Sequence, residues 1–170
     1  MPGSKLRQSP SQTVGPYFAY GLSPGQYGYA HQSVVTPDLA SEDTEGERMR
    51  LIGQVLDGED RPINDAMIEI WQANAHGRYN HPADSRSDNL VDPGFTGFGR
   101  SGTGAERNAR FMFNTIKPGM IGDGQAPHIN MIITMRGLLV HMFTRVYFDD
   151  ETQANAEDPV LAVVPETRRH

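Results

Sequence analysis

Apolar and polar residues alternate in short runs along the chain from residue 49 onward. Three such runs cover Met49–Leu56, Ala66–Ala73 and Arg110–Ile116, and two strongly apolar runs follow at His128–Met135 and Leu138–Phe148. Successive side chains of a β-strand point to opposite faces of the sheet, so alternation of this kind is typical of strands with one buried face. We therefore predict a strand in each of these runs.

Turn-forming residues separate the predicted strands. Asp57–Asp65 (DGEDRPIND) follows the first run, Lys117–Gly119 (KPG) follows the third, and Arg136-Gly137 lies between the last two. Aspartate, asparagine, glycine and proline favour the backbone conformations of tight turns. Two strands on either side of an Asp-Gly turn indicate a hairpin, so we expect the first two strands to pair with each other.

Three segments lack this alternation. Residues 1–48 are rich in turn formers with interspersed aromatic residues, which predicts an extended arm that packs on the sandwich or on a partner chain. Asn74–Asn108 is a long polar stretch, and loops of this length are uncommon unless they are functional or disordered. Asp149–Ala156 opens with helix-capping and acidic residues and is followed by Pro159, so we expect one short helix there.

Short strands, many turns and almost no helix indicate an all-β protein. The predicted fold is an antiparallel β-sandwich with long loops, an extended N-terminal arm (residues 1–48) and one short C-terminal helix. The sandwich domain is expected to cover residues 49–170. The sequence stops soon after Val160–Val164, where a sandwich could end or could lack a last strand.

The composition narrows the class of protein. The 170 residues suffice for one domain with a buried core, and 18 glycines with 12 prolines agree with a loop-rich fold. The formal net charge is −6 and no run of Lys and Arg occurs, so no nucleic-acid partner is expected. The sequence has no cysteine, which excludes disulfides and thiolate metal ligands. It shows neither a signal peptide nor an apolar stretch of the ~18 residues that a membrane span needs, so we expect a cytoplasmic protein without membrane contact.

Histidines offer the clearest potential for chemistry. His76 and His81 flank Tyr79 in the long polar stretch, and His128 begins a predicted strand with Asn130 two positions later. Positions i and i+2 of a strand share a face, so a His-x-His pair there would suit a metal ion. Asparagine offers a ferric ion only a neutral amide oxygen, which is a poor ligand. The residues alone therefore favour a hydrogen-bonded strand-end histidine at His128.

Other catalytic patterns are weaker. His141 lies inside an apolar run and is interpreted as a core or interface histidine. The sequence has no Gly-x-Ser-x-Gly elbow for a serine nucleophile. The glycine-rich stretch Gly94–Gly104 neither follows a clear strand nor opens a helix, which argues against a phosphate site.

Several longer motifs follow one another along the chain. They are LIGQVLD at Leu51–Asp57, IEIWQANAHGRY at Ile68–Tyr79, TIKPG at Thr115–Gly119 and APHI at Ala126–Ile129. These motifs resemble the intradiol ring-cleavage dioxygenases, a family of β-sandwich proteins with a non-haem ferric ion. Two further stretches, Ser11–Tyr17 (SQTVGPY) and Thr144–Ala156 (TRVYFDDETQANA), resemble the α chain of family members that cleave protocatechuate. The resemblance also implies that residues 49–170 lack the last C-terminal strands of the family's sandwich.

The resemblance implies an Fe(3+) site made of two tyrosines and two histidines in the family's catalytic chains. The matching positions in this chain are Tyr79, Met120, His128 and Asn130, so one ligand of each type is retained. Thioether and amide groups cannot replace tyrosinate and imidazole on a ferric ion. We therefore expect these vestigial iron-ligand positions to bind no metal, this chain alone to have no catalytic residue, and Fe(3+) to be bound by a partner β subunit.

The resemblance also implies a role in the partner's substrate pocket. The implied pocket-lining residues are Thr13, Gly15, Pro16 and Arg136. Glycine and proline let the backbone approach an aromatic ring closely, and an arginine attracts and orients an aromatic carboxylate. From the residues alone, Arg136 is instead a solvent-facing hairpin residue. The expected activity is O₂-dependent intradiol cleavage of protocatechuate to 3-carboxy-cis,cis-muconate by a higher αβ oligomer.

Two alternatives stay open at this stage. The first is a self-sufficient intradiol dioxygenase with an atypical iron site that recruits His76 or His81, although Met120 and Asn130 argue against it. The second is a non-catalytic β-sandwich binding module. Metal analysis of the isolated chain would test the first, and the partner's activity without this chain would test the second.

Overall fold

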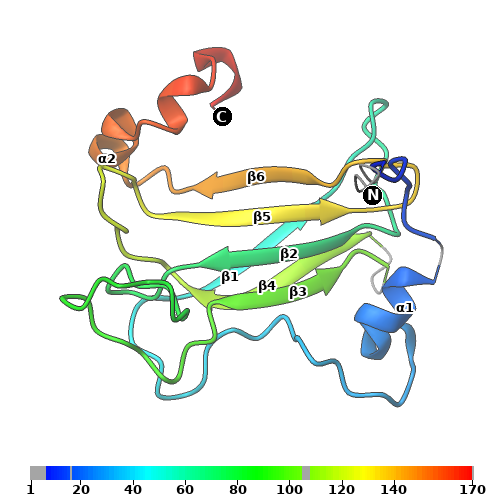
Figure 1. The fold of residues 1–170 in the computed structure, drawn as a ribbon, viewed down its shortest axis with the longest axis horizontal. Helices are drawn as coiled ribbons and strands as arrows, with labels where there is room; N and C mark the ends of the chain where they lie inside the picture. Colours follow the sequence, from blue (N-terminus) through cyan, green and yellow to red (C-terminus); the bar gives the residue numbers. More distant parts are fainter. Residues whose placement is uncertain (1–6, 16, 105–107, 170) are drawn as a thin grey trace, which may run out of the picture.

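The computed structural model describes residues 7–15, 17–104 and 108–169 and shows two antiparallel β-sheets. The strands are β1 (Arg48–Gln54), β2 (Met67–Gln72), β3 (Phe98–Gly102), β4 (Arg110–Ile116), β5 (His128–Thr134) and β6 (Met142–Tyr147). One sheet pairs β1 with β4, and the other has the strand order β3-β2-β5-β6. In Figure 1 the two-stranded sheet lies behind the four-stranded sheet and crosses it obliquely. The predicted antiparallel β-sandwich is confirmed.

The hydrophobic core lies between the two sheets. Ile68 and Ile70 of β2 and Ile129 of β5 are fully buried on the larger sheet. Phe113 of β4 and Leu39, which precedes β1, belong to the same buried cluster. Burying a side chain of this size stabilises the fold by about 1.5–3 kcal/mol relative to leaving it exposed, so the core is the main force that holds the sheets together.

The strand prediction from alternating residues is largely confirmed. In β4, Phe111 and Phe113 are buried, whereas Arg110 before them and Met112 between them are exposed, as the pattern requires. The run Leu138–Phe148 is the exception, because β6 begins only at Met142 and the residues before it form the connection from β5.

The predicted hairpin between the first two strands is wrong. β1 pairs with β4, and β2 pairs with β3 and β5, so the two strands lie in different sheets. The turn between them is nevertheless tight, since Leu56 and Pro62 form an isolated bridge and Asp57 Oδ1 accepts hydrogen bonds from two backbone N–H groups of the turn. Alternation shows which side chains face a core, but it does not show which strands pair.

Two further elements depart from the prediction. β3 lies within Asn74–Asn108, the stretch predicted to be a loop. Its small residues give no apolar alternation, yet they are needed, because a Cβ on Gly99 would lie 2.4 Å from Leu39 Cδ1. The N-terminal region contains helix α1 (Phe18–Leu22) and a 3-10 turn at Pro24–Tyr27, so this part of the predicted arm is not extended.

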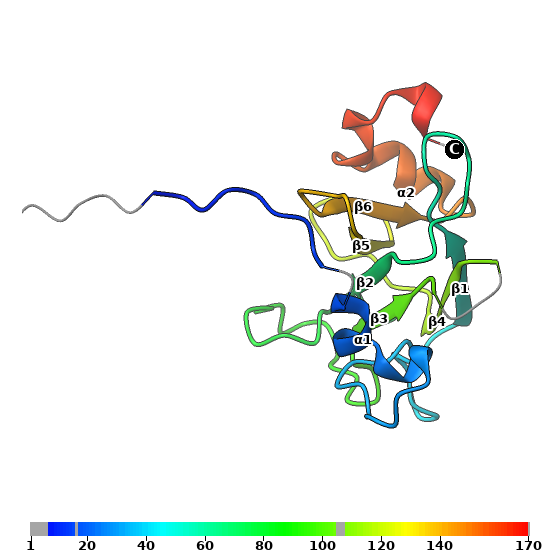
Figure 2. The ribbon, with the colours of Figure 1, turned by 90° about the vertical axis from the view of Figure 1, so that its right-hand side faces the viewer.

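The N-terminal region follows the edge of the sandwich before it reaches β1. Gln26 Oε1 accepts a 2.7 Å hydrogen bond from Gly102 N, and Leu39 N donates to Asn114 O at 2.9 Å. Residues 7–12 instead run away from the sheets, as the dark blue segment in Figure 2 shows.

Helical turns follow β6. Helix α2 (Thr152–Glu157) confirms the predicted short helix, and 3-10 turns at Leu161–Val163 and Glu166–Arg168 continue the chain. The buried carboxylate of Asp158 accepts a 2.9 Å hydrogen bond from Ala126 N and thereby ties this segment to the start of β5. Within the part of the chain that the structure describes, none of the helices is long and apolar enough to cross a membrane.

Candidate functional site

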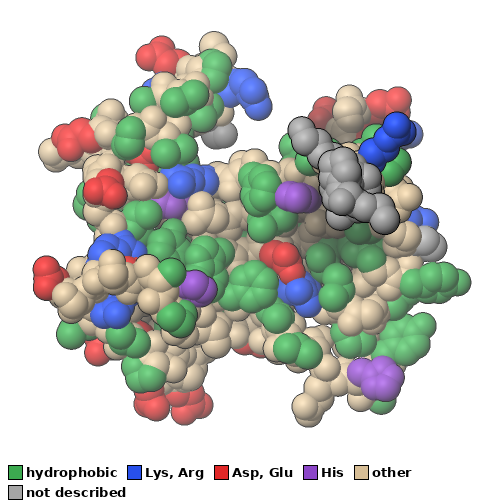
Figure 3. All heavy atoms as spheres, in the orientation of Figure 1, with side chains coloured by type: hydrophobic (Ala, Val, Ile, Leu, Met, Phe, Trp, Pro, Cys, Tyr) green, Lys and Arg blue, Asp and Glu red, His purple; other side chains and the backbone are tan. Residues whose placement is uncertain are grey.

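The face of the four-stranded sheet that points away from the core carries a row of polar and aromatic side chains. Trp71, Asn130 and Arg145 are register partners on β2, β5 and β6, so their side chains lie side by side. His128 and Tyr147 form a second pair of register partners, with ring centroids 5.9 Å apart. Figure 3 shows this face, where hydrophobic side chains surround a few charged groups and histidines.

A tight loop after β2 brings Tyr79 to this row. Asn74 Oδ1 accepts hydrogen bonds of 3.0 Å from two backbone N–H groups of the loop. Gly77 has a φ of +75°, and a Cβ there would lie 1.8 Å from the carbonyl oxygen of Met120, so only glycine fits. The Tyr79 ring then stacks on Trp71, with 5.5 Å between centroids and 10° between planes.

Asn130 links Tyr79 to Arg145. The side-chain nitrogen Nδ2 of Asn130 donates to Tyr79 Oη at 3.1 Å, and its Oδ1 accepts a 3.1 Å hydrogen bond from Arg145 Nε. Arg145 Nη1 donates in addition to Gln125 Oε1 at 3.0 Å and to Tyr147 Oη at 3.4 Å. The half-buried guanidinium is therefore held by three neighbours at the β6 end of the row.

His128 and Met120 occupy the other two vestigial positions. His128 is 2% exposed, and its Nδ1 lies 2.8 Å from the carbonyl oxygen of Ala126, which confirms a hydrogen-bonded strand-end histidine. Its Nε2 is buried and has no hydrogen-bond partner in the structure of residues 7–15, 17–104 and 108–169. Met120 is half exposed, and its backbone packs against the Tyr79 loop.

Burial favours the neutral forms of the ionisable groups in this row. It raises the pKa of the Tyr79 phenol, although the hydrogen bond from Asn130 and the charge of Arg145 partly oppose the shift. Burial likewise lowers the pKa of the His128 imidazole against the effect of its hydrogen bond to Ala126. The row thus holds two phenols whose pKa is raised by burial, Tyr79 and Tyr147, an imidazole whose pKa is lowered, and the guanidinium of Arg145.

The four positions that the resemblance assigns to iron ligands do not fit a ferric ion. Tyr79 Oη faces the amide donor of Asn130, and the amide oxygen of Asn130 faces a guanidinium. A ferric ion requires anionic oxygen or basic nitrogen donors at such places. Among the described residues, no group of three or more His, Cys, Asp or Glu side chains that could hold a metal ion is found.

The remaining candidate histidines make other contacts. His76 Nε2 lies 2.9 Å from Glu45 Oε2. His81 Nδ1 accepts a hydrogen bond from Ala83 N, and its ring meets Trp71 edge-on. His141 precedes β6, is exposed and contacts Phe143, so of its interpretation as a core or interface histidine the core alternative is wrong and the interface alternative stays a prediction.

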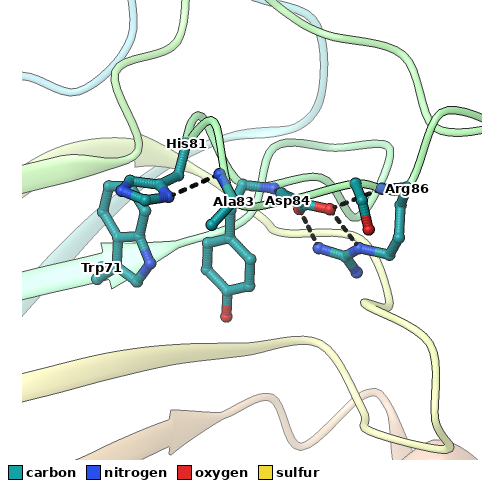
Figure 4. Close-up of a pocket in the computed structure, with 7 residues that line it drawn as sticks. Trp71, His81, Ala83, Asp84 and Arg86 are labelled. Atoms are coloured by element: carbon teal, nitrogen blue, oxygen red, sulfur yellow. Dashed lines mark hydrogen bonds and ion pairs between the residues drawn. The ribbon is translucent and has the colours of Figure 1, made fainter.

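A cleft of about 530 Å³ opens beside Tyr79 (Figure 4). It is lined by Trp71, Tyr79, His81, Ala83, Asp84, Ser85 and Arg86. Arg86 pairs with Asp84, and this ion pair lowers the pKa of the Asp84 carboxyl well below its usual range. The sequence singled out Tyr79 and His81 but missed the ion pair. It also missed Arg145, whose signal was a charged residue inside an apolar run.

A second cluster forms at the opposite end of β5. Thr13 Oγ1 accepts a 2.7 Å hydrogen bond from Gly137 N and donates to the Met135 carbonyl oxygen at 3.4 Å. Arg136 therefore lies on the turn that Thr13 contacts, and its Nε pairs with the carboxylate of Asp65. The structure thus brings Thr13 to the turn that carries Arg136, 123 positions later in the sequence, and the pocket-lining role of both residues stays a prediction.

The row around Asn130 and the cluster of Thr13 and Arg136 are far apart. Arg136 follows Asn130 by six positions, with β5 running between them. At ~3.3 Å per residue of strand the separation is roughly 20 Å, too far for one aromatic ring to contact both. Gly15 is exposed near Thr13, and Pro16 lies outside the described residues.

Comparisons with known proteins agree with this architecture. The family model described as Dioxygenase matches residues 13–167. The chain is 55% identical to the protocatechuate 3,4-dioxygenase alpha chain of Burkholderia cepacia, over 96% of this chain and 81% of that one. The chain belongs to the intradiol dioxygenase family.

Other intradiol dioxygenase relatives extend this result. The chain is 38% identical to the protocatechuate 3,4-dioxygenase beta chain of Burkholderia cepacia, over 73% of this chain and 54% of that one. The dioxygenase domain of a dioxygenase carbohydrate-binding protein fusion from Streptomyces sp. SirexAA-E gives a TM-score of 0.55 at 23% identity, with 90% of this chain and 86% of that chain covered. At 23% identity, the similarity to the Streptomyces structure shows the fold alone.

Proposed function

We propose that this chain is the α-type subunit of a protocatechuate-cleaving intradiol dioxygenase and completes the substrate pocket of a β-type partner that binds Fe(3+). The reaction inserts both atoms of O₂ while breaking the bond between the two hydroxyl-bearing ring carbons, which gives 3-carboxy-cis,cis-muconate. The relatives named alpha and beta chains support a two-chain enzyme of this kind.

The separation of the two clusters carries this proposal. Thr13 and Arg136 lie roughly 20 Å from Asn130, at the other end of a strand. Residues that line a substrate pocket must lie near the centre that attacks the substrate. The Thr13–Arg136 cluster is therefore suited to line a pocket whose ferric ion is bound by another chain. The row around Asn130 does not itself offer a ligand set that fits iron.

Arg136 can recognise the carboxylate of the substrate. A guanidinium has five N–H donors, and the contact from Nε to Asp65 orients the group while the terminal nitrogens can bind a carboxylate in bidentate fashion. Arg136 is 54% exposed in this chain, so a partner's pocket can form around it.

An exposed apolar segment beside Arg136 supports a partner surface. Leu139, Val140, Met142 and Phe143 are 60%, 62%, 53% and 70% exposed, and the last two belong to the edge strand β6. Contiguous exposed apolar residues are typical of protein–protein contacts, and exposed strand edges are normally covered. We propose that the β-type partner covers this segment, which places the pocket-lining residues at the interface.

The test is Arg136→Ala in the complex of this chain with its β-type partner. Loss of a charge-assisted contact to the substrate should lower kcat/KM for protocatechuate by about ten-fold, mainly through KM, while the iron content per αβ pair stays unchanged. Arg50→Ala, which removes an exposed arginine from β1 in the other sheet, is the matched control and should leave kcat/KM unchanged.

Two results would contradict the proposal. Wild-type kcat/KM in the Arg136→Ala complex would show that this side chain does not contact the substrate. Stoichiometric iron in the unmodified chain purified without a partner would show that the chain has its own centre.

A further inference from the structure

The row of vestigial ligand positions contains a cation of its own. Arg145 stands directly opposite Asn130 in the register of β5 and β6, with its Nε 3.1 Å from Asn130 Oδ1. Nδ2 of the same Asn130 amide group donates to Tyr79 Oη at 3.1 Å. The guanidinium is thus one side chain away from the retained tyrosine, on the sheet face where a metal bound by these positions would lie.

Arg145 is fixed in this position rather than free to swing away. Besides Asn130 it donates to Gln125 before β5 and to Tyr147 on its own strand. Tyr147 Oη in turn donates to the fully buried carboxylate of Asp158 at 3.4 Å, which supplies negative charge near the guanidinium. A half-buried cation that donates to several such partners is held in place by them.

One ligand-type atom in the row is still available. His128 Nε2 is buried and unpartnered within the described residues, and His128 shares its sheet face with Asn130. Buried polar atoms usually have a hydrogen-bond partner, so this nitrogen is an unusual remnant. The loss of two ligands is therefore only part of what separates this row from a metal site.

We propose that Arg145 excludes a metal ion from this row, and that the Tyr79–Asn130–Arg145 hydrogen bonds replace the cross-link that a metal would make between the Tyr79 loop and β5. Like charges repel strongly in a partly buried site. The inference rests on the proposed function, in which this chain holds no iron.

The test rebuilds the ligands with and without Arg145 in the full chain. One variant carries Met120→Tyr and Asn130→His, and a second adds Arg145→Gln. A third adds Arg50→Gln to the first pair of changes, which removes an exposed arginine from the other sheet as the matched control. Each is incubated with iron, and bound iron is measured by elemental analysis and by the visible absorption of a tyrosinate bound to Fe(III).

We expect the variant without Arg145 to bind iron at least about ten-fold more tightly than the double variant and the Arg50 control, and to be the one with the tyrosinate absorption. Equal iron binding by the double variant and the variant that also carries Arg145→Gln would overturn the inference and leave the loss of two ligands as the whole cause. Iron in the unmodified chain would instead overturn the proposed function, so the two failures are distinguishable.

Folding of each variant is checked by circular dichroism. If the Arg145→Gln variant does not fold, Arg145→Met replaces it, because methionine keeps an unbranched apolar stem without the charge. A folded Arg145→Gln or Arg145→Met variant that binds no more iron than the double variant would likewise overturn the inference.

Discussion

At the scale of single residues, Gln72 is a polar side chain that joins the two sheets inside the core. It is fully buried on β2, and its Nε2 donates to the carbonyl oxygen of Ile116 on β4 at 2.9 Å. Its Oε1 accepts a 2.7 Å hydrogen bond from the hydroxyl of Thr115. A buried polar group is tolerated only when such partners are present, so Gln72 and Thr115 depend on each other.

We expect Gln72→Leu to lower the free energy of unfolding by about 2 kcal/mol, because the Thr115 hydroxyl loses its buried acceptor. Urea denaturation would measure the change, and Gln54→Leu on an exposed position of β1 should stay within about 0.5 kcal/mol of the wild type. Adding Thr115→Val to Gln72→Leu should recover part of the loss. An equal loss in the Gln54 variant would show that the effect is not due to the buried pair.

At the scale of elements, Asp158 anchors the C-terminal helical turns to the sheet. Its carboxylate accepts hydrogen bonds from Val160 N at 2.8 Å, Leu161 N at 2.7 Å and Ala126 N at 2.9 Å. Burial opposes ionisation, but these N–H groups and the charge of Arg145 outweigh it and lower the pKa of Asp158. The ionised carboxylate is therefore the form that holds the segment.

The sign of the pH dependence follows from this lowered pKa. A carboxyl group whose pKa is lower in the folded state stabilises the fold above its unfolded pKa, about 3.9, and loses that contribution as the pH falls through the folded value. We expect Asp158→Asn to lower the free energy of unfolding by about 1–3 kcal/mol at pH 6, with a difference that shrinks below about pH 4. Urea denaturation across this range is the measurement, with Asp88→Asn at an exposed carboxylate as control. A difference that stays constant with pH would contradict the assignment.

The elements also show how far the sequence could predict the fold. β4 was predictable because Phe111 and Phe113 alternate with exposed residues. β3 was not predictable, since its buried positions are the small residues Gly99 and Ser101, and Gly99 packs closely against Leu39. Strand pairing was not predictable, because β1 pairs with β4, more than 50 positions later by number, and no local pattern encodes a pairing between distant segments.

The candidate site was predictable only in part. The motifs located Tyr79 and His128, but the position of Arg145 depends on the register of β5 against β6. A shift of that register by one residue would place Arg145 on the opposite face of the sheet, so the contact with Asn130 is a property of the assembled sheet.

At the scale of the whole molecule, β5 separates two regions with different roles. Its first residues carry the row around Asn130, which is closed by hydrogen bonds and a resident guanidinium. Its far end leads to Arg136, the Thr13 contact and the exposed apolar segment before and within β6. The end that we propose for the partner is thus the end that is exposed.

The exposed apolar segment gives the last prediction. Phe143 is 70% exposed on β6, and we expect Phe143→Ser to weaken assembly with the β-type partner by about ten-fold or more, since an aromatic residue at the centre of an interface contributes about 2 kcal/mol or more. Sedimentation or calorimetric titration of the two chains would measure the dissociation constant. Val34→Ser is the control, because Val34 is 98% exposed but lies outside this segment. If both variants assemble as tightly as the wild type, the partner binds elsewhere and Arg136 does not line its pocket; if only Phe143→Ser fails to assemble, the interface and the pocket-lining role stand together.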